Sequence, residues 1–296
     1  ETANVNFTHA EYFTLAVTEN FNQPTDLTNL RAWYDATDNT TLYTDESCAT
    51  QVSTTGQDVR CWQDKSNYSA NATNVSGKGM PTFITNEFNG LSVLNFSKSE
   101  TDTLRHVVPA QYTANFTIFL VIQSKGNAAT YDSFFSNGEP ADSTHFQIDY
   151  TNDSGQNSFR YGASTKFLFE NYSNEIRLYS VTHNSTFTRL YNEGNDVNNG
   201  STTEGRVFEH YRINQNRNGN QHHNSKIAEI ILYDRVLTNC ELEKVNIYLG
   251  TKYGRDFFGV SDNYGYGSPH DNDINGIGEF NSTCTTTKEF TRAQSD

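Results

Sequence analysis

Short segments in which apolar and polar residues alternate, separated by Gly, Asn and Asp, recur along most of this chain. Successive side chains of a β-strand point to opposite faces, so this pattern is typical of strands with one buried face. Even spacing with turn residues between the segments predicts an all-β fold of two antiparallel sheets packed face to face. The expected strands lie near residues 80–84, 91–97, 116–124, 132–136, 144–150, 157–162, 176–183, 186–192, 207–213 and 226–233.

One segment has the spacing of a helix instead. Thr238 and Glu241 fit a capping box, in which each side chain caps the other residue's backbone. Leu242, Val245 and Leu249 then recur at helical intervals, and a glycine follows where a helix would end, at position 254. The sequence therefore predicts one amphipathic helix of about four turns that closes the domain.

The composition limits the possible partners. The 296 residues suffice for one large all-β domain or two small ones. Only 34% of residues are hydrophobic and the mean hydropathy is -0.71, so Tyr and Phe rather than Leu and Met must fill the core. A net charge of -14 argues against nucleic acid and anionic membranes as partners. The longest apolar run, Phe116 to Ile122, is too short to insert across a membrane.

Longer blocks of sequence follow one another in a fixed order. They are LRAWYDATD (30–38), CWQDKS (61–66), FNGLSVLNF (88–96), FTIFLVIQS (116–124), IRLYSVTHNSTFTRLYNEG (176–194) and KIAEIILYDRVLTNCELEKVNIYLGTKYG (226–254). Together they resemble the laminin-G-like branch of the concanavalin A-like lectin/glucanase superfamily, as found in large secreted surface and adhesin proteins. The resemblance implies a two-sheet antiparallel jelly-roll sandwich over residues 30–254, in a family where binding and adhesion are commoner than catalysis.

Two extensions flank this predicted domain. Residues 1–29 contain the alternating segment Tyr12–Thr18, which predicts one further strand. Residues 255–296 are rich in Gly, Asn and Asp, and the stretch Asn272–Gly278 is similar to one that follows laminin-G-like domains in bacterial surface proteins. We expect this tail to be an extension packed on the jelly roll.

The tail also contains a candidate calcium site. Asp271, Asp273 and Asn275, followed by Gly276, reproduce the opening of a calcium loop, in which oxygens at alternate positions converge on the ion. The closing glutamate is missing, because Ser282 occupies the twelfth position. Calcium and a plain turn both remain open, and calcium is the possible cofactor.

The cysteines predict disulfides. Cys48, Cys61, Cys240 and Cys284 lack the spacing of a zinc site, so we expect two bonds, Cys48–Cys61 and Cys240–Cys284. Each would reduce the loop entropy of the unfolded chain by roughly 3 to 4 kcal/mol. The alternative is four free thiols in a reducing compartment.

Asn-x-Ser/Thr sequons support a secreted glycoprotein, although the chain is so rich in Asn, Ser and Thr that many arise by composition alone. Asn95 and Asn115 flank expected strands and are poorer acceptors. The better acceptors, in turn-like sequence, are Asn39, Asn67, Asn71, Asn74, Asn152, Asn199 and Asn281.

A catalytic site is not expected. Glucanases of the superfamily carry catalytic carboxylates on one strand as E-x-D-x-x-E, which places them on the same face, and no such triplet occurs here. Glu229 lies in a strand pattern without a second acid two or four residues along, so we interpret it as structural.

Several other conspicuous residues have structural interpretations. Asp35 and Asp64 belong to the family blocks and are expected to hydrogen-bond turns. Trp33 and Trp62 match family positions at which the ring fills the core. The pair His222–His223 lies in the polar run 214–224, which predicts a solvated loop tip.

These observations predict a non-catalytic extracellular module. It would bind a glycan or a cell-surface partner through loops at one rim of the sandwich, with residues 195–205 and 214–224 supplying stacking and amide hydrogen bonds. The alternative is a structural subunit of an extracellular filament, sheath or surface layer. In that case Tyr12–Thr18 would add to the sheet edge of a neighbouring molecule.

Overall fold

A computed structural model describes residues 21–255 except for positions 114, 126–130, 139–145, 152–155, 162–164, 172–173 and 202–205. The predicted strand Tyr12–Thr18 and nearly all of the predicted tail lie outside these residues. The filament alternative, which depends on that strand, therefore stays a prediction. Within the described residues, no helix is long and apolar enough to cross a membrane.

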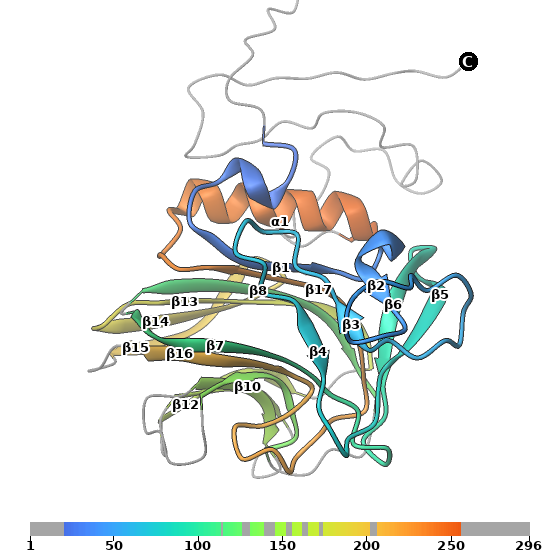
Figure 1. Cartoon of the computed structure of the whole chain (residues 1–296). Helices are drawn as coiled ribbons and strands as arrows, with labels where there is room; N and C mark the ends of the chain where they lie inside the picture. The colour runs from blue at the N-terminus through green and yellow to red at the C-terminus, as the bar shows by residue number, and fades with distance from the viewer. Residues whose placement is uncertain are drawn as a thin grey trace, which may run out of the picture.

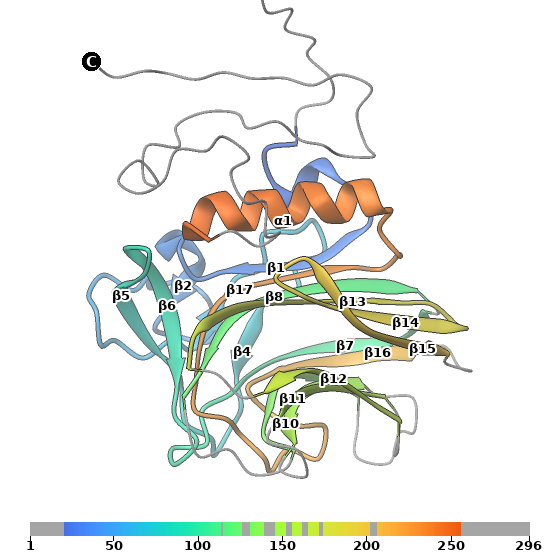
Figure 2. The same cartoon turned by 180° about the vertical axis from the view of Figure 1, so that it is seen from behind.

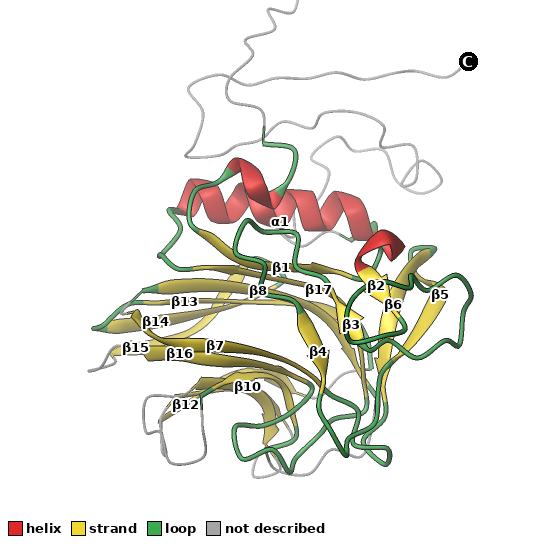
Figure 3. Ribbon diagram, in the orientation of Figure 1, coloured by secondary structure: helices red, strands yellow, loops and turns green. Residues whose placement is uncertain are grey.

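The chain folds into two stacked antiparallel sheets with one long helix (Figures 1 and 3). Sheet A has the strand order β15-β14-β13-β8-β17-β6-β5, and β1 pairs with β17 beside β6. Its strands are β1 (Leu30–Asp35), β5 (Thr82–Phe88), β6 (Leu91–Phe96), β8 (Phe116–Ser124), β13 (Ile176–His183), β14 (Phe187–Asn192), β15 (Asn195–Ser201) and β17 (Ser225–Tyr233).

Sheet B has the order β12-β11-β10-β9-β16-β7-β4-β3-β2. Its strands are β2 (Leu42–Tyr43), β3 (Cys61–Trp62), β4 (Ala72–Asn74), β7 (Leu104–Thr113), β9 (Ser133–Asn137), β10 (Phe146–Thr151), β11 (Gln156–Tyr161), β12 (Thr165–Asn171) and β16 (Arg206–Ile213). Two 3-10 helices, η1 (Pro24–Asp26) and η2 (Asn39–Thr41), precede and follow β1.

Sheet A is buried on both faces because its central strand is apolar on both. Ile118 and Leu120 of β8 point into the core between the sheets. Phe119 and Val121 point to the opposite face, which the helix α1 (Asn239–Tyr253) covers. We call that opposite face the outer face of sheet A, and Figures 1 and 2 show α1 lying along it.

The helix follows its sequence signals. Thr238 and Glu241 form the predicted capping box, and Gly254 ends the helix in the left-handed region at φ 61°. Leu242, Val245 and Leu249 are buried against the outer face of sheet A. This confirms the predicted helix and the two-sheet antiparallel sandwich.

Each of the ten strands expected between residues 80 and 233 is present within a few residues of its predicted place. The prediction of a loop over residues 195–205 is wrong for its described part, because Asn195–Ser201 forms β15. Its Asn-rich sequence has low strand propensity, but its backbone pairs with β14, and pairing outweighs propensity in strands. The expected strands also omit β1, β7, β12 and the short β2, β3 and β4.

Candidate functional site

Glu229 occupies a closed structural network beneath α1. Its carboxylate accepts hydrogen bonds from Nε1 of Trp33 (2.7 Å), the hydroxyls of Tyr248 (3.1 Å) and Tyr253 (2.8 Å), and Nζ of Lys252 (2.7 Å). Only 1% of Glu229 is exposed, so substrate cannot reach it. This position supports its interpretation as a structural residue.

Asp35 and Asp64 hold turns, as expected. Asp64 accepts from the backbone N–H of Trp33 and of Ser66, both at 2.8 Å. Asp35 accepts from the N–H and the hydroxyl of Thr37. The rings of Trp33 and Trp62 are buried, as the resemblance implied.

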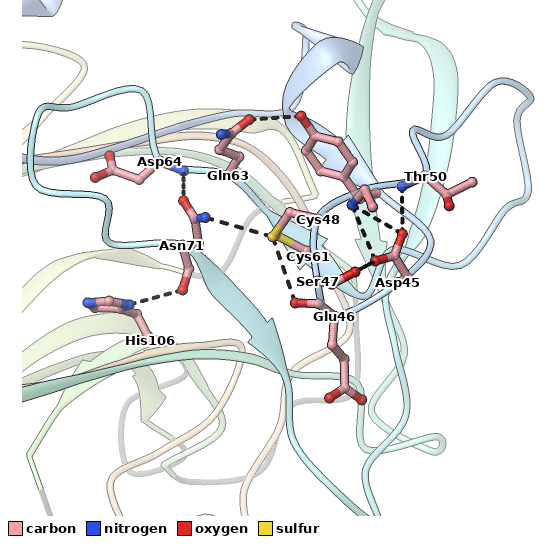
Figure 4. Close-up of a disulfide and its surroundings, with 12 residues drawn as sticks. Asp45, Glu46, Ser47, Cys48, Thr50, Cys61, Gln63, Asp64, Asn71 and His106 are labelled. Carbon is pink, nitrogen blue, oxygen red and sulfur yellow. Dashed lines mark hydrogen bonds between the residues drawn. A yellow bond between two sulfur atoms is a disulfide. The ribbon is translucent and has the colours of Figure 1, made fainter.

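The disulfide Cys48–Cys61 is present as predicted (Figure 4). It connects the segment that follows β2 to the strand β3. The strands β2 and β3 are neighbours in sheet B. Cys240 is also disulfide-bonded, and its predicted partner, Cys284, lies outside the described residues.

The sequons differ in accessibility. Asn39, Asn67 and Asn199 are exposed, whereas Asn71 and Asn74 are half-buried. Asn71 is a poor acceptor, because its Oδ1 accepts from the N–H of Asp64 (3.0 Å) and its Nδ2 contacts Sγ of Cys48 (3.7 Å) (Figure 4). Asn152 and Asn281 lie outside the described residues, and use of the sequons stays a prediction.

The candidate calcium ligands Asp271, Asp273 and Asn275 also lie outside the described residues. Among the residues that the structure does describe, no group of three or more His, Cys, Asp or Glu side chains could hold a metal ion. Calcium binding therefore stays a prediction.

The prediction that His222–His223 forms a solvated loop tip is wrong. Both histidines are buried, His222 at 2% and His223 at 0% exposed. Nδ1 of His223 faces the backbone oxygen of Asn224 (2.7 Å), and its Nε2 faces the hydroxyl of Ser124 (3.2 Å). Both ends of the run 214–224 are buried, while Asn218 and Asn220 in its middle are exposed. The buried histidines each have a hydrogen-bond partner on Nδ1, which sequence alone does not reveal.

The structure has a pocket at the first turn of α1, which we call the α1 pocket. Its volume is 190 Å³. One wall is the hairpin of β13 and β14, and the other is the connection from β17 into α1. The lining residues are Thr182, His183, Asn184, Phe187, Arg189, Tyr191, Val236, Leu237, Asn239 and Leu242.

Strand alternation places the functional side chains of β14. Thr188 and Leu190 are fully buried in the sandwich. Phe187, Arg189 and Tyr191 therefore share the outer face of sheet A, as a row of two aromatic rings with a cation between them. The guanidinium of Arg189 lies 5.6 Å from the ring centroid of Phe187 and forms an ion pair with Asp196 of β15 at 3.2 Å. Its side chain is 40% exposed and can reach a ligand.

Hydrogen bonds hold both walls of the α1 pocket. Oδ1 of Asn184 accepts from the N–H groups of Thr186 (2.9 Å) and Phe187 (2.7 Å), which fixes the β13–β14 turn. In the opposite wall, the N–H of Leu237 donates to Oγ1 of Thr117 (2.9 Å).

The capping box supports the same wall. Arg235 contacts both carboxylate oxygens of Glu241 at 2.7 Å. This contact lowers the pKa of Glu241 to about 2, against the opposing effect of partial burial. A pocket with walls already fixed loses little conformational entropy when a ligand binds.

Sequence reasoning missed this pocket. The alternation of Phe187, Arg189 and Tyr191 was visible, but that α1 would lie against this end of β14 was not. Of the two loops predicted to bind, only Asn195–Ser201 lies near the pocket, as β15 beside β14.

Three solved structures are similar in fold. The first is the binding domain of Paraclostridial Mosquitocidal Protein 1, with a TM-score of 0.52 and 14% identity over 76% of this chain and 52% of that chain. The second is the binding domain of botulinum neurotoxin serotype D, with a TM-score of 0.51 and 16% identity over 75% of this chain and 51% of that chain. The third is the binding domain of botulinum neurotoxin serotype G, with a TM-score of 0.50 and 14% identity over 65% of this chain and 51% of that chain. This chain spans about half the length of each. At such low identity the likeness shows a common sandwich fold. No family model and no curated protein matches the sequence.

Proposed function

We propose that this chain is a non-catalytic extracellular module that binds a glycan through the α1 pocket. The observation that carries the proposal is the row of Phe187, Arg189 and Tyr191 facing the start of α1. A sugar ring has an apolar C–H face that packs on aromatic rings and a rim of hydroxyls that accept from a guanidinium. The α1 pocket presents both kinds of group side by side.

The size of the pocket favours a single ring of a longer glycan. Sites that enclose a drug-sized ligand measure roughly 300 to 1,000 Å³, and the α1 pocket has 190 Å³. The rest of the glycan would extend over exposed residues such as Asn199 and Asn239. The similar toxin structures are themselves described as binding domains, which supports a binding role.

The non-catalytic part of the proposal rests on the carboxylates. Asp35 and Glu229 lie opposite each other on neighbouring strands, but both are buried under α1 and share one lysine. Most glycoside hydrolases use two accessible carboxylates on either side of the scissile bond, and this pair is enclosed. The disulfide supports an extracellular location, because such bonds persist in oxidising compartments.

A glycan microarray probed with the native chain tests this function, followed by product analysis of each bound glycan after prolonged incubation. We expect a restricted set of glycans to be retained and recovered intact. Cleavage of a bound glycan, or a signal no higher than that of the bare surface for every glycan, would contradict the proposal.

A further inference from the structure

A second aromatic surface lies on the opposite side of the sandwich from α1, on the outer face of sheet B. Along β10, Phe146 and Ile148 point into the core, which turns Gln147 and Asp149 outward. Arg160 of β11 lies opposite Gln147 in the register. Figures 1 and 2 both show β10 and α1 at opposite ends of the stack of layers.

Tyr131, just before β9, lies over this outward face. The guanidinium of Arg160 is 4.4 Å from the centroid of the Tyr131 ring, in the geometry of a cation–π contact. One face of the ring is thus occupied by the protein, while 44% of Tyr131 remains exposed. The ring therefore stacks on Arg160 while part of Tyr131 is open to solvent.

The support beneath the ring is rigid. Asp149 is fully buried and accepts from Nε of Arg160 at 2.8 Å. It also accepts from the hydroxyl of Ser158 and the amide of Gln147. These contacts fix the guanidinium in place, so the ring that stacks on it is held in one orientation.

The backbone of Tyr131 is strained to achieve this placement. Its φ of 74° lies in the left-handed region, which a bulky residue rarely adopts. Its N–H nevertheless donates to the backbone oxygen of Tyr150 at 2.9 Å, which locks the residue onto the edge of β10. Strain of this kind concentrates at binding sites.

We propose that Tyr131, supported by Arg160 and Asp149, is a second glycan-binding platform on which a pyranose ring stacks. A protein partner would need apolar surface around the ring to exclude water. The described neighbours beneath the ring, Gln147, Asp149, Ser158 and Arg160, are polar and largely buried, so they add no apolar surface around it. A sugar needs no such surface, because its C–H face covers the ring and its hydroxyls stay hydrated. The platform is separate from the α1 pocket, so one molecule would contact glycan on two opposite faces.

Saturation-transfer NMR with methyl glycosides of glucose, galactose, mannose and N-acetylglucosamine tests the platform. All proteins in this experiment carry Arg189→Gln, which removes the arginine of the α1 pocket. Binding at the platform is thus tested separately from binding in the α1 pocket, and failure of one proposal is distinguishable from failure of the other. With Tyr131 present we expect transfer to at least one glycoside. Tyr131→Ala should lower this transfer strongly, to what the weakened α1 pocket alone gives, and Tyr131→Phe should retain it.

Tyr68 provides a matched control. It is 49% exposed and lies 4.5 Å from the guanidinium of Arg31, so it resembles Tyr131 in exposure and in stacking. Tyr68→Ala should leave transfer unchanged, and near-ultraviolet circular dichroism verifies that each variant is folded. The proposal is overturned if no glycoside receives transfer, if Tyr131→Ala has no effect, or if Tyr68→Ala lowers transfer equally.

Discussion

Asp35 and Glu229 face each other across β1 and β17 and share a single cation, Nζ of Lys252, at 2.8 and 2.7 Å. Burial raises the pKa of Glu229, and the charge of Asp35 adds to this effect. Burial would also raise the pKa of Asp35. The positive charges of Lys252 and Lys65 outweigh burial there, so the pKa of Asp35 is lowered. Lys252 comes from α1, so this shared ion pair fastens the helix to sheet A.

Removing this cation should destabilise the protein. Lys252→Met would leave two buried carboxylates facing each other, and breaking a buried ion pair costs about 3 to 5 kcal/mol. We expect the loss in urea unfolding at pH 8 to exceed the loss at pH 5, because burial raises the pKa of Glu229 and acidification therefore favours its neutral form, which removes the repulsion. Lys125→Met, at an exposed lysine, is the control and should change stability little. Equal, small effects of both substitutions would mean that the ion pair does not fasten the helix.

The Cys48–Cys61 bond should stabilise the fold without determining it. The bond closes a loop with a sequence separation of 13, and cross-links of this span contribute roughly 3 kcal/mol by restricting the unfolded chain. The double variant Cys48→Ala, Cys61→Ala should keep the native circular dichroism spectrum and unfold at a lower urea concentration. An unchanged midpoint would show that the bond contributes nothing.

His223 should make stability depend on pH. Burial lowers its pKa to about 4, so between pH 6.5 and pH 4 the unfolded chain binds a proton that the folded chain does not. The contribution of neutral His223 to the free energy of unfolding is complete above pH 6.5. It falls by about 1.4 kcal/mol per pH unit as the pH is lowered from 6.5 to 4, and it is lost below that range. His223→Gln removes this dependence on pH. The difference in unfolding free energy between the native and variant chains should therefore shrink by about 1.4 kcal/mol for each pH unit of acidification in this range. A constant difference across this range would contradict the buried, neutral histidine.

The sequence predicted the elements whose signals are local. Thr238, Glu241 and Gly254 mark the ends of α1 because capping depends on residues within a turn of the helix end. Most strands follow from alternation. Among the strands that alternation did not predict, β15 has a polar sequence that only its pairing with β14 makes a strand, and that pairing is a property of the whole sheet.

The candidate sites were less predictable because they depend on distant contacts. The α1 pocket needs the β13–β14 hairpin and the start of α1, which are separated by more than forty residues and meet only in the fold. The buried state of His222–His223 likewise depends on partners such as Ser124 on another strand. In contrast, Glu229 was interpreted as structural from its strand pattern, and its closed network supports that interpretation.

The most direct test of the central claim is a calorimetric titration of the glycan best retained on the microarray into native, Arg189→Gln and Arg105→Gln chains. Arg105 is a half-buried arginine of β7 in sheet B, whereas the strands that line the α1 pocket belong to sheet A, and it serves as the control. Hydrogen bonds to a charged group contribute about 1.5 to 3 kcal/mol, so Arg189→Gln should weaken binding about tenfold or more. The control should bind as the native chain does. Native affinity in a folded Arg189→Gln chain would contradict glycan binding in the α1 pocket.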